Sequence, residues 1–251
     1  MAYKASAFTS PQSGITYTDG LPSDWNIMKE IGMAISEASG SINANTTGTI
    51  YINKINTWAY KITPGNTINV NNHLYAVMGF NNFALTNQGN YGGTHSTAGL
   101  TFGAVDCVGN YKMRAVDTNT GGWGECEMRT STMPTLQSGM PATLAQVKVP
   151  YVKYGQSTIS YSDDYMFLPA EKEVFGTRTD SPEAEANALT QFAYYKNEGS
   201  KIKSFSGSRA YWWLRSVTYR YRDSFCLVTP DGRVSNSVAS SSRSAAPCFC
   251  V

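Results

Sequence analysis

Charged residues are scarce in this sequence. Lys, Arg, Asp and Glu make up 15 % of the 251 residues, whereas typical soluble domains carry roughly 25 %. The 20 basic and 18 acidic residues leave a formal net charge of +2, so the concentrated basic field of a nucleic-acid-binding protein is missing. No apolar run approaches the roughly 20 residues that a membrane helix needs, and no signal-peptide pattern opens the sequence. We therefore expect neither a nucleic-acid partner nor a membrane span.

Cysteine and histidine are also few, and their spacing matches no metal site. The five cysteines contain no CxxC pair, and Cys248 and Cys250 alternate as on one face of a strand. An odd count without metal-ligand spacing disfavours a disulfide framework or a zinc ribbon, and reduced, buried cysteines are the expectation. The only histidines are His73 and His95. We expect no metal and no other cofactor.

The motifs of the common catalytic sites are absent: there is no G-x-S-x-G, no H-E-x-x-H and no P-loop. His95, in a Gly-rich stretch, could act as a base, but a loop histidine with satisfied hydrogen bonds is favoured. The pairs Asp163–Asp164 and Glu171–Glu173 could bind a metal or transfer protons. Solvated surface charges, or acids favoured at a helix start, are the preferred interpretation. We expect that the protein is not an enzyme.

The first part of the chain predicts an arm followed by a helix. Residues 1–20 are polar and without periodicity, which is typical of an arm or linker. Ser23 is a candidate N-cap, and apolar residues at helical spacing then continue to Gly40. Residues 41–56 predict a loop with one short strand around Ile50.

The remainder predicts mostly strands. Residues 57–80 alternate with period two and predict a strand meander, followed by a Gly/Asn-rich loop over 81–99. Further strands are expected at four C-terminal segments (211–216, 224–229, 233–240 and 247–251), with a turn at Pro230-Asp231-Gly232. Two strands are expected at 146–154 and 158–168, and helical segments at 133–147, 169–175 and 182–197. Without alternating βαβ units, this order predicts an α+β fold with antiparallel sheets and flanking helices.

The last 35 residues, 217–251, have an unusual composition. They contain no Lys, Glu, Met, Gln or Trp, although these types fill 40 of the other 216 positions. About six or seven would be expected here from the composition of the rest of the chain. These five are the amino acids that remain unreachable when both adenines of an Asn codon are randomised and the third base stays a pyrimidine. A region of small residues that happens to avoid long side chains is the alternative explanation.

A frame of residues within the C-terminal part resembles a known family. The frame consists of Trp212-Trp213-Leu214-Arg215-Ser216, then Phe225-Cys226-x-Val228, Gly232 and a closing Phe249-Cys250-Val251. It is similar to the ending of the variable proteins of diversity-generating retroelements, a bacterial and phage family. The resemblance implies a C-type-lectin-like fold, in the variant of the formylglycine-generating enzymes, over residues 57–251. It implies a variable region at about 217–247, which a reverse transcriptase rewrites with errors at adenines. Residues 1–56 form an N-terminal arm and helix of unassigned role.

The resemblance divides the C-terminal residues into two sets. The fixed scaffold set would be buried beneath the ligand-binding face, with Arg215 in a buried polar contact. This set comprises Trp212, Trp213, Leu214, Arg215, Phe225, Val228, Gly232 and Phe249. The variable set would bind the ligand, and Tyr and Arg are the residue types that dominate binding interfaces. It comprises Thr218, Tyr219, Arg220, Tyr221, Arg222, Asp223, Leu227, Thr229, Arg233, Ser235, Asn236, Ser237, Ser240, Ser241, Ser242 and Arg243.

The expected function is therefore non-catalytic binding of diverse macromolecular ligands, proteins or glycans on a cell surface, by a hypervariable face. The expected location is a phage tail or a bacterial cell surface. A structural component of a phage tail or cell envelope without a diversified site is the alternative. An enzyme related to the sulfatase-modifying enzymes, which share the lectin-like fold, ranks last. Such an enzyme needs a reactive cysteine, whereas the cysteines of this chain lie within the expected strands.

Overall fold

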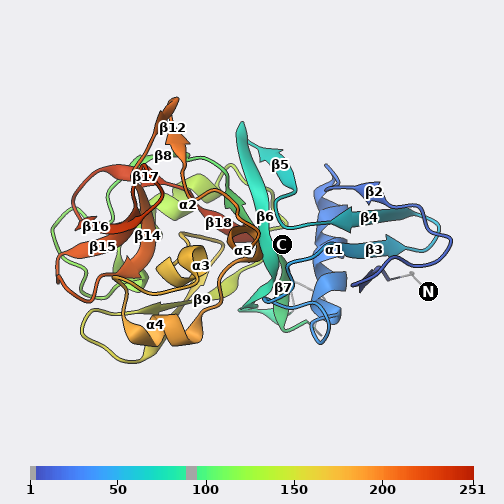
Figure 1. Cartoon of the computed structure of the whole chain (residues 1–251), viewed down its shortest axis with the longest axis horizontal. Coiled ribbons are helices and arrows are strands. Elements are labelled where there is room, and N and C mark those ends of the chain that lie inside the picture. The colour runs from blue at the N-terminus through green and yellow to red at the C-terminus, as the bar shows by residue number, and fades with distance from the viewer. Residues whose placement is uncertain (1–3, 89–94) are drawn as a thin grey trace.

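The computed structural model describes residues 4–88 and 95–251, and it shows a mostly-β α+β fold. An N-terminal unit and a larger C-terminal unit lie along the long axis of the molecule, joined at strands β6 and β7 (Figure 1). The predicted α+β class is confirmed at this level, whereas two of the sheets are mixed and not antiparallel, because β2–β4 and β14–β17 are parallel pairs. None of the helices in the described ranges has the length and hydropathy needed to cross a bilayer.

The N-terminal unit is a four-stranded sheet with one helix across it. The sheet order is β1-β3-β4-β2, in which only β2 and β4 are parallel. Its elements are β1 (Ser6–Phe8), β2 (Thr18–Asp19), α1 (Trp25–Glu37), β3 (Ile50–Lys54) and β4 (Trp58–Ile62). Helix α1 is where the spacing predicts it, but its N-cap is Asp24, whose side chain accepts a 2.8 Å hydrogen bond from Asn26 N.

Two predictions about this unit need correction. Residues 1–20 are not simply an arm, because β1 and β2 are paired strands of the sheet. The predicted boundary between residues 56 and 57 falls in the turn of the β3–β4 hairpin, where Asn56 has φ 59°. Five residue pairs join these two strands, so the N-terminal unit continues to Ile62.

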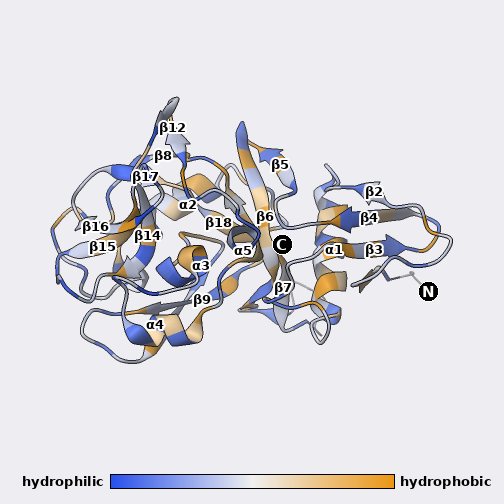
Figure 2. Cartoon of the chain, viewed as in Figure 1, coloured by the Kyte–Doolittle hydropathy of each residue, from blue (hydrophilic) through white to orange (hydrophobic). Residues whose placement is uncertain are grey.

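The central sheet has the order β11-β18-β7-β6-β5 and is antiparallel throughout. Its strands are β5 (Thr67–Val70), β6 (His73–Ala84), β7 (Thr97–Ala104), β11 (Met166–Phe167) and β18 (Cys248–Cys250). Strand β6 is buried over most of its length, and apolar residues colour part of its ribbon orange in Figure 2. Strand β6 extends four residues into the segment predicted as a loop, and β7 begins at Thr97, so the loop is shorter than expected.

Aromatic packing and a close backbone approach fasten α1 to the central sheet. Phe102 and Phe249 stack with ring centroids 5.1 Å apart, and Trp25 of α1 contacts both rings. A Cβ at Gly99 would lie 2.0 Å from the carbonyl oxygen of Gly32. Only glycine therefore allows α1 and β7 to approach this closely.

The C-terminal sheet has the order β16-β15-β14-β17-β8, and β14 and β17 are parallel. Its strands are β8 (Gly109–Tyr111), β14 (Trp212–Val217), β15 (Ser224–Val228), β16 (Val234–Val238) and β17 (Arg243–Ala245). The four predicted C-terminal strands are confirmed. So is the turn at residues 230–232: Gly232 has φ 83° and donates its N–H to Thr229 O.

Two small hairpins and several short helices complete the chain. The hairpins are β9 (Val147–Val152) with β10 (Ile159–Asp164), and β12 (Ser204–Phe205) with β13 (Ser208–Arg209). The helices are η2 (Trp123–Glu125), η3 (Met128–Thr132), α2 (Met133–Gln137), α3 (Glu171–Phe175), α4 (Glu183–Ala188) and α5 (Ala193–Lys196). The helix predicted over 133–147 ends at Gln137, shortly before Gly139 and Pro141, and the one predicted over 182–197 is broken after Ala188.

Candidate binding surface

The loop between β14 and β15, residues 218–223, presents a row of exposed aromatic and basic side chains. Tyr219 is 45 % and Tyr221 55 % exposed, and Arg220 and Arg222 are exposed beside them. This segment is called the display loop below. The loop is flanked by buried residues: Thr218 at its start is fully buried, and Ser224, the first residue of β15, is also buried.

The backbone of the display loop is held from outside by one asparagine and one aspartate. Tyr219 N donates to Asp180 O at 2.9 Å, and Asn119 N donates to Arg222 O at the same distance. The Asn119 side chain also donates to Tyr221 O at 2.8 Å and to Ser224 O at 2.7 Å. Since Asn119 is fully buried, these bonds are shielded from water, and they do not involve the exposed side chains.

A second set of backbone contacts fixes the neighbouring turn after β16. Ala239 N donates to Asp223 O at 2.8 Å, and Ala239 O accepts from Met113 N and Arg114 N. Ser240 N donates to Asp117 Oδ1 at 3.0 Å. The hydrogen bonds from Ser240 hold the pKa of Asp117 below its usual value. The display loop and the 239–242 turn therefore lie side by side as a single surface.

Asp180 links the loop to strand β16. The Arg220 guanidinium approaches Asp180 Oδ1 at 3.3 Å, and the Asn236 side chain donates to Asp180 Oδ2 at 3.0 Å. Two guanidinium groups, those of Arg178 and Arg220, lie 4.9 and 5.2 Å from the centroid of the Tyr219 ring. Cation–π contacts at exposed sites contribute about 0.5–1 kcal/mol each.

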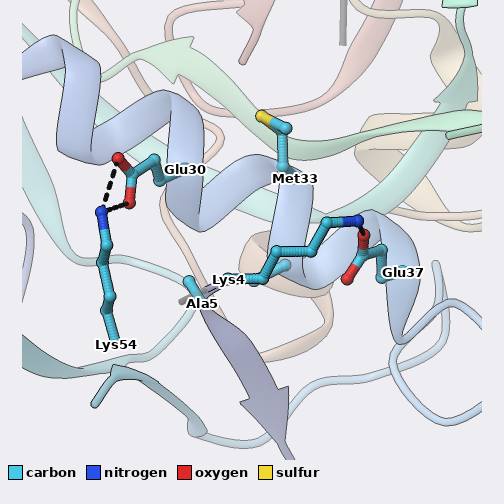
Figure 3. A pocket seen from close by; sticks show the side chains of 7 residues that line it. Lys4, Ala5, Glu30, Met33, Glu37 and Lys54 are labelled. Atoms are coloured by element: carbon cyan, nitrogen blue, oxygen red, sulfur yellow. Dashed lines mark hydrogen bonds and ion pairs between the residues drawn. The ribbon is translucent and has the colours of Figure 1, made fainter. Parts of the chain in front are cut away.

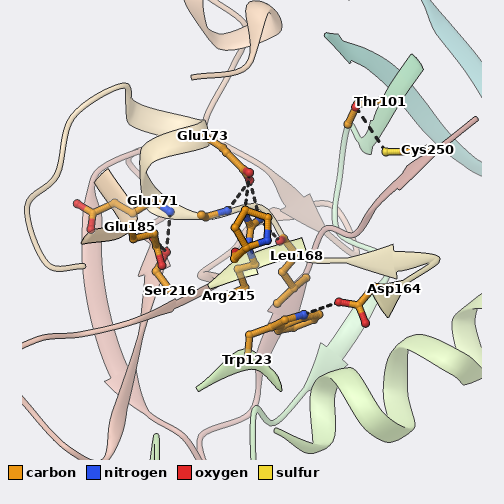
Figure 4. A network of polar contacts seen from close by, with 12 residues as sticks. Thr101, Trp123, Asp164, Leu168, Glu171, Glu173, Glu185, Arg215, Ser216 and Cys250 are labelled. Carbon is orange, nitrogen blue, oxygen red and sulfur yellow. Dashed lines mark hydrogen bonds and ion pairs between the residues drawn. The ribbon is translucent and has the colours of Figure 1, made fainter. Parts of the chain in front are cut away.

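Beneath Asp180, a buried carboxylate holds the 179–181 backbone. Glu171 is fully buried and accepts from Thr179 N at 2.5 Å, Asp180 N at 3.1 Å and Ser181 N at 2.5 Å. Its own N–H donates to Ser216 Oγ at 2.8 Å (Figure 4). The acid lies at a helix start as predicted, in the first turn of α3, but it is buried and not a solvated surface charge.

The second acid of that pair, Glu173, is equally buried and binds Arg215. Both guanidinium nitrogens contact the carboxylate at 2.6 Å, and Arg215 also donates to Leu168 O and Pro150 O (Figure 4). Burial disfavours the charged guanidinium, but Glu173 outweighs it and raises the pKa of Arg215. The buried polar contact expected for Arg215 is present, and Glu173, like Glu171, is not a surface charge.

Asp164 is likewise structural, in contrast to its exposed neighbour Asp163. It accepts hydrogen bonds from Trp123 Nε1 at 2.8 Å, Arg129 Nε at 2.6 Å and Ser162 Oγ at 2.6 Å. His95 is buried, and burial lowers its pKa. In the described residues, no group of three His, Cys, Asp or Glu side chains is arranged to hold a metal ion.

The structure gathers only part of the predicted variable set. Tyr219 to Asp223, Asn236 and Ser240 to Ser242 share the surface around the display loop. Thr229 and Arg233 lie at the opposite end of β15 and β16, in the 229–233 turn. Ser235 and Ser237 alternate with Asn236 and so face the other side of β16, and Arg243 stacks on Tyr211 at 5.1 Å.

Two members of the variable set are corrected. Thr218 is fully buried and Leu227 is 1 % exposed, because β14 and β15 are buried along their whole length and Thr218 directly follows β14. A ligand at the surface cannot contact either side chain, so both belong to the scaffold. Seven of the predicted scaffold residues are fully buried: Trp212, Trp213, Leu214, Arg215, Phe225, Val228 and Phe249. The eighth, Gly232, is only half-buried, because it lies in the 229–233 turn.

Sequence reasoning missed the residues that position the display loop: Asn119, Asp117, Asp180 and Arg178. They come from two segments, 117–119 and 178–180, that are far from the loop in the sequence, and no local motif marks them. The nearest signal was the Gly121-Gly122 pair after Asn119, where both glycines have positive φ.

A separate recess of about 210 Å³ lies in the N-terminal unit, between α1, β1 and β3. Ala5, Met33 and Ala34 give it an apolar lining (Figure 3). Ion pairs Lys54–Glu30 and Lys4–Glu37, each at 2.9 Å, border it. It lies in a different unit from the display loop.

Comparison with known proteins adds one finding. A family model described as "Domain of unknown function (DUF6273)" matches residues 100–251. That range contains β8 to β18, and so all residues of the display loop and its anchors. No curated protein and no solved structure matches the chain.

Proposed function

The chain belongs to the DUF6273 family, and from the surface that the matched region builds we propose that it is a non-catalytic ligand-binding protein. The display loop and the 239–242 turn form the binding face. Its ligands are proteins or glycans on a cell surface, because an exposed face rich in Tyr and Arg suits macromolecules.

The observation that carries this proposal is how the display loop is held. Its main chain is bound by Asn119 and Asp180, and its neighbouring turn by Asp117, Met113 and Arg114. These bonds go to the loop backbone and do not use the side chains at 219–222, of which Arg220 also pairs with Asp180. Exposed substitutions usually change stability by less than about 0.5 kcal/mol each. A loop built in this way tolerates sequence change while keeping its shape.

We propose further that this face is diversified by a retroelement, on a C-type-lectin-like scaffold in a phage tail or at a bacterial cell surface. The composition of residues 217–251 supports this, since it lacks the five residue types that adenine mutagenesis of Asn codons cannot produce. The burial of the scaffold residues beneath an exposed loop is consistent with it.

A structural role in a phage tail or cell envelope is the second candidate. It is favoured by the N-terminal unit, which lies outside the matched family region at the other end of the long axis (Figure 1). That role predicts that related genes in one population carry the same 217–247 segment.

Two experiments test the proposal. Sequencing the DNA beside the gene is expected to find a near-repeat of the codons for 217–247 that differs only at adenines, next to a reverse-transcriptase gene. Replacing Tyr219, Arg220, Tyr221 and Arg222 together is expected to change which bacterial cells the purified protein binds, with a melting temperature within a few degrees of the parent. A large loss of stability from this replacement would overturn the proposal.

A further inference from the structure

A recess of about 290 Å³ opens beside the display loop. Its walls come from the tip of the β9–β10 hairpin, from the segment entering α4, and from the loop itself. The lining residues are Tyr154, Gly155, Gln156, Ser157, Arg178, Pro182, Glu183, Ala184 and Tyr219. Of these, only Tyr219 belongs to the predicted variable set.

The size of the recess limits what it can hold. Pockets for drug-sized ligands measure about 300–1,000 Å³, and this one, at about 290 Å³, lies just below that range. It accommodates a single ring, and it is too small for an extended peptide or a nucleotide chain.

The charges in the recess balance. Arg178 supplies one cation and Glu183 one anion, and Glu183 has no ion-pair partner among the residues that the structure describes. A ligand with a net charge of either sign would be repelled by one of these two charged groups, so an uncharged ligand fits best.

The recess is lined by hydrogen-bond donors and acceptors and by two tyrosine side chains, Tyr154 and Tyr219. The Gln156 amide does both, the Glu183 carboxylate accepts, and Ser157 and the tyrosine hydroxyls can do either. Arg178 is held in place, because its Nε donates to Ser181 O at 2.5 Å and its guanidinium stacks on Tyr219. Its remaining N–H groups are therefore preorganised donors.

Adjacent hydroxyl groups on a ring need this combination, since each hydroxyl both donates and accepts. The apolar face of such a ring packs on an aromatic side chain. An apolar side chain in the recess would make no hydrogen bond with the Glu183 carboxylate or the Gln156 amide, both of which are exposed and point to a polar ligand.

We propose that this recess binds one neutral sugar ring, the end of a glycan. The inference deepens the proposed function and rests on it, because Tyr219 would be the wall that diversification alters. The hairpin and the α4 segment would supply constant contacts to the sugar, and the loop would select its surroundings.

The test uses the full chain and saturation-transfer NMR with glucose, galactose, mannose and N-acetylglucosamine, and with glucuronic acid as the charged comparison. Transfer to at least one neutral sugar is expected. Glu183→Gln and Gln156→Ala are each expected to weaken it about tenfold, as for loss of a hydrogen bond to a charged or amide group. Glu127→Gln and Gln137→Ala, at exposed or partly exposed positions outside the recess, are the matched controls and should bind as the parent does.

Three outcomes would overturn the sugar site: no transfer to any neutral sugar, binding of glucuronic acid alone, or equal binding by Glu183→Gln and the parent. These results leave the proposed function standing if replacement of residues 219–222 still changes which cells are bound. Conversely, the replacement of residues 219–222 could leave cell binding unchanged while sugar binding persists and is weakened by Gln156→Ala. That result would overturn the diversified face and support the sugar site in the recess.

Discussion

Arg215 and Glu173 form a two-pronged ion pair in the centre of the C-terminal unit, with Nη1–Oε2 and Nη2–Oε1 both at 2.6 Å. Both side chains are at most 2 % exposed. Glu173 Oε2 also accepts from Ala170 N at 2.9 Å, so the pair connects α3 to β14. The floor beneath the display loop therefore depends on a buried charge pair as well as on apolar packing.

Removing one partner of this pair should destabilise the protein strongly. Arg215→Ala leaves the Glu173 carboxylate buried without its cation, and breaking a buried pair in this way costs about 3–5 kcal/mol. Urea unfolding measures the loss. The comparison variant is Lys148→Ala, an exposed cation on β9, which should unfold at nearly the parent urea concentration.

Asn119→Ala should loosen the display loop. The substitution removes two side-chain hydrogen bonds to the loop carbonyls of Tyr221 and Ser224, each worth about 1 kcal/mol net and more where the carbonyl stays buried. We expect a loss of roughly 2–3 kcal/mol and faster hydrogen exchange at residues 219–224. Asn187→Ala, at an exposed position of α4, is the control, and unchanged exchange in Asn119→Ala would contradict the anchoring role.

Leu227→Ala and Ser235→Ala separate the two kinds of residue within the predicted variable set. Leu227 is in the core, and truncating a buried leucine costs about 2–5 kcal/mol. Ser235, its partner across β15 and β16, is half-exposed, so its loss should change stability by less than about 0.5 kcal/mol. Thermal unfolding of both variants distinguishes the two sites, and equal stability would place Leu227 outside the core.

Glu185→Gln should reduce the dependence of stability on pH. Burial raises the pKa of Glu185 from 4.5 to about 7, although Arg215 and the Ser216 hydrogen bond oppose the shift. A carboxyl whose pKa is higher in the folded state contributes stability below pH 4.5 and loses that contribution as the pH rises to about 7. The parent should therefore lose up to roughly 3 kcal/mol relative to the variant across this range, as measured by urea unfolding at several pH values. A constant difference between parent and variant would contradict this.

The cysteines should be unreactive in the folded protein. All five are free and buried, and burial raises the pKa of Cys107 to about 11 and the pKa values of Cys126 and Cys250 to about 12. Because the thiolate is the reactive form, a thiol reagent at pH 8 should label none of them in the native chain and all five in denaturant. Rapid labelling of the native protein would contradict the buried positions.

Strand and helix positions could be predicted where periodicity was strong, as for α1 and the C-terminal strands. Helix α3 was also predicted, by the segment 169–175. The break between α4 and α5 could not be predicted, because the segment between them is fixed by a tertiary contact, the bond from Phe192 N to Glu173 O. The burial of Glu171 and Glu173 was also hidden, because the sequence shows two acids at a helix start and does not show Arg215 facing them. The display loop was recognisable from its composition, whereas Asn119 and Asp180 meet it only through the fold.

The end-to-end arrangement of the two units has a mechanical consequence. The display loop and the β3–β4 hairpin lie at opposite ends of the long axis (Figure 1), so tension between a ligand and a support would run through the molecule. That load would pass across the Gly32–Gly99 contact and through the central sheet, whose strand β6 runs across the long axis (Figure 1).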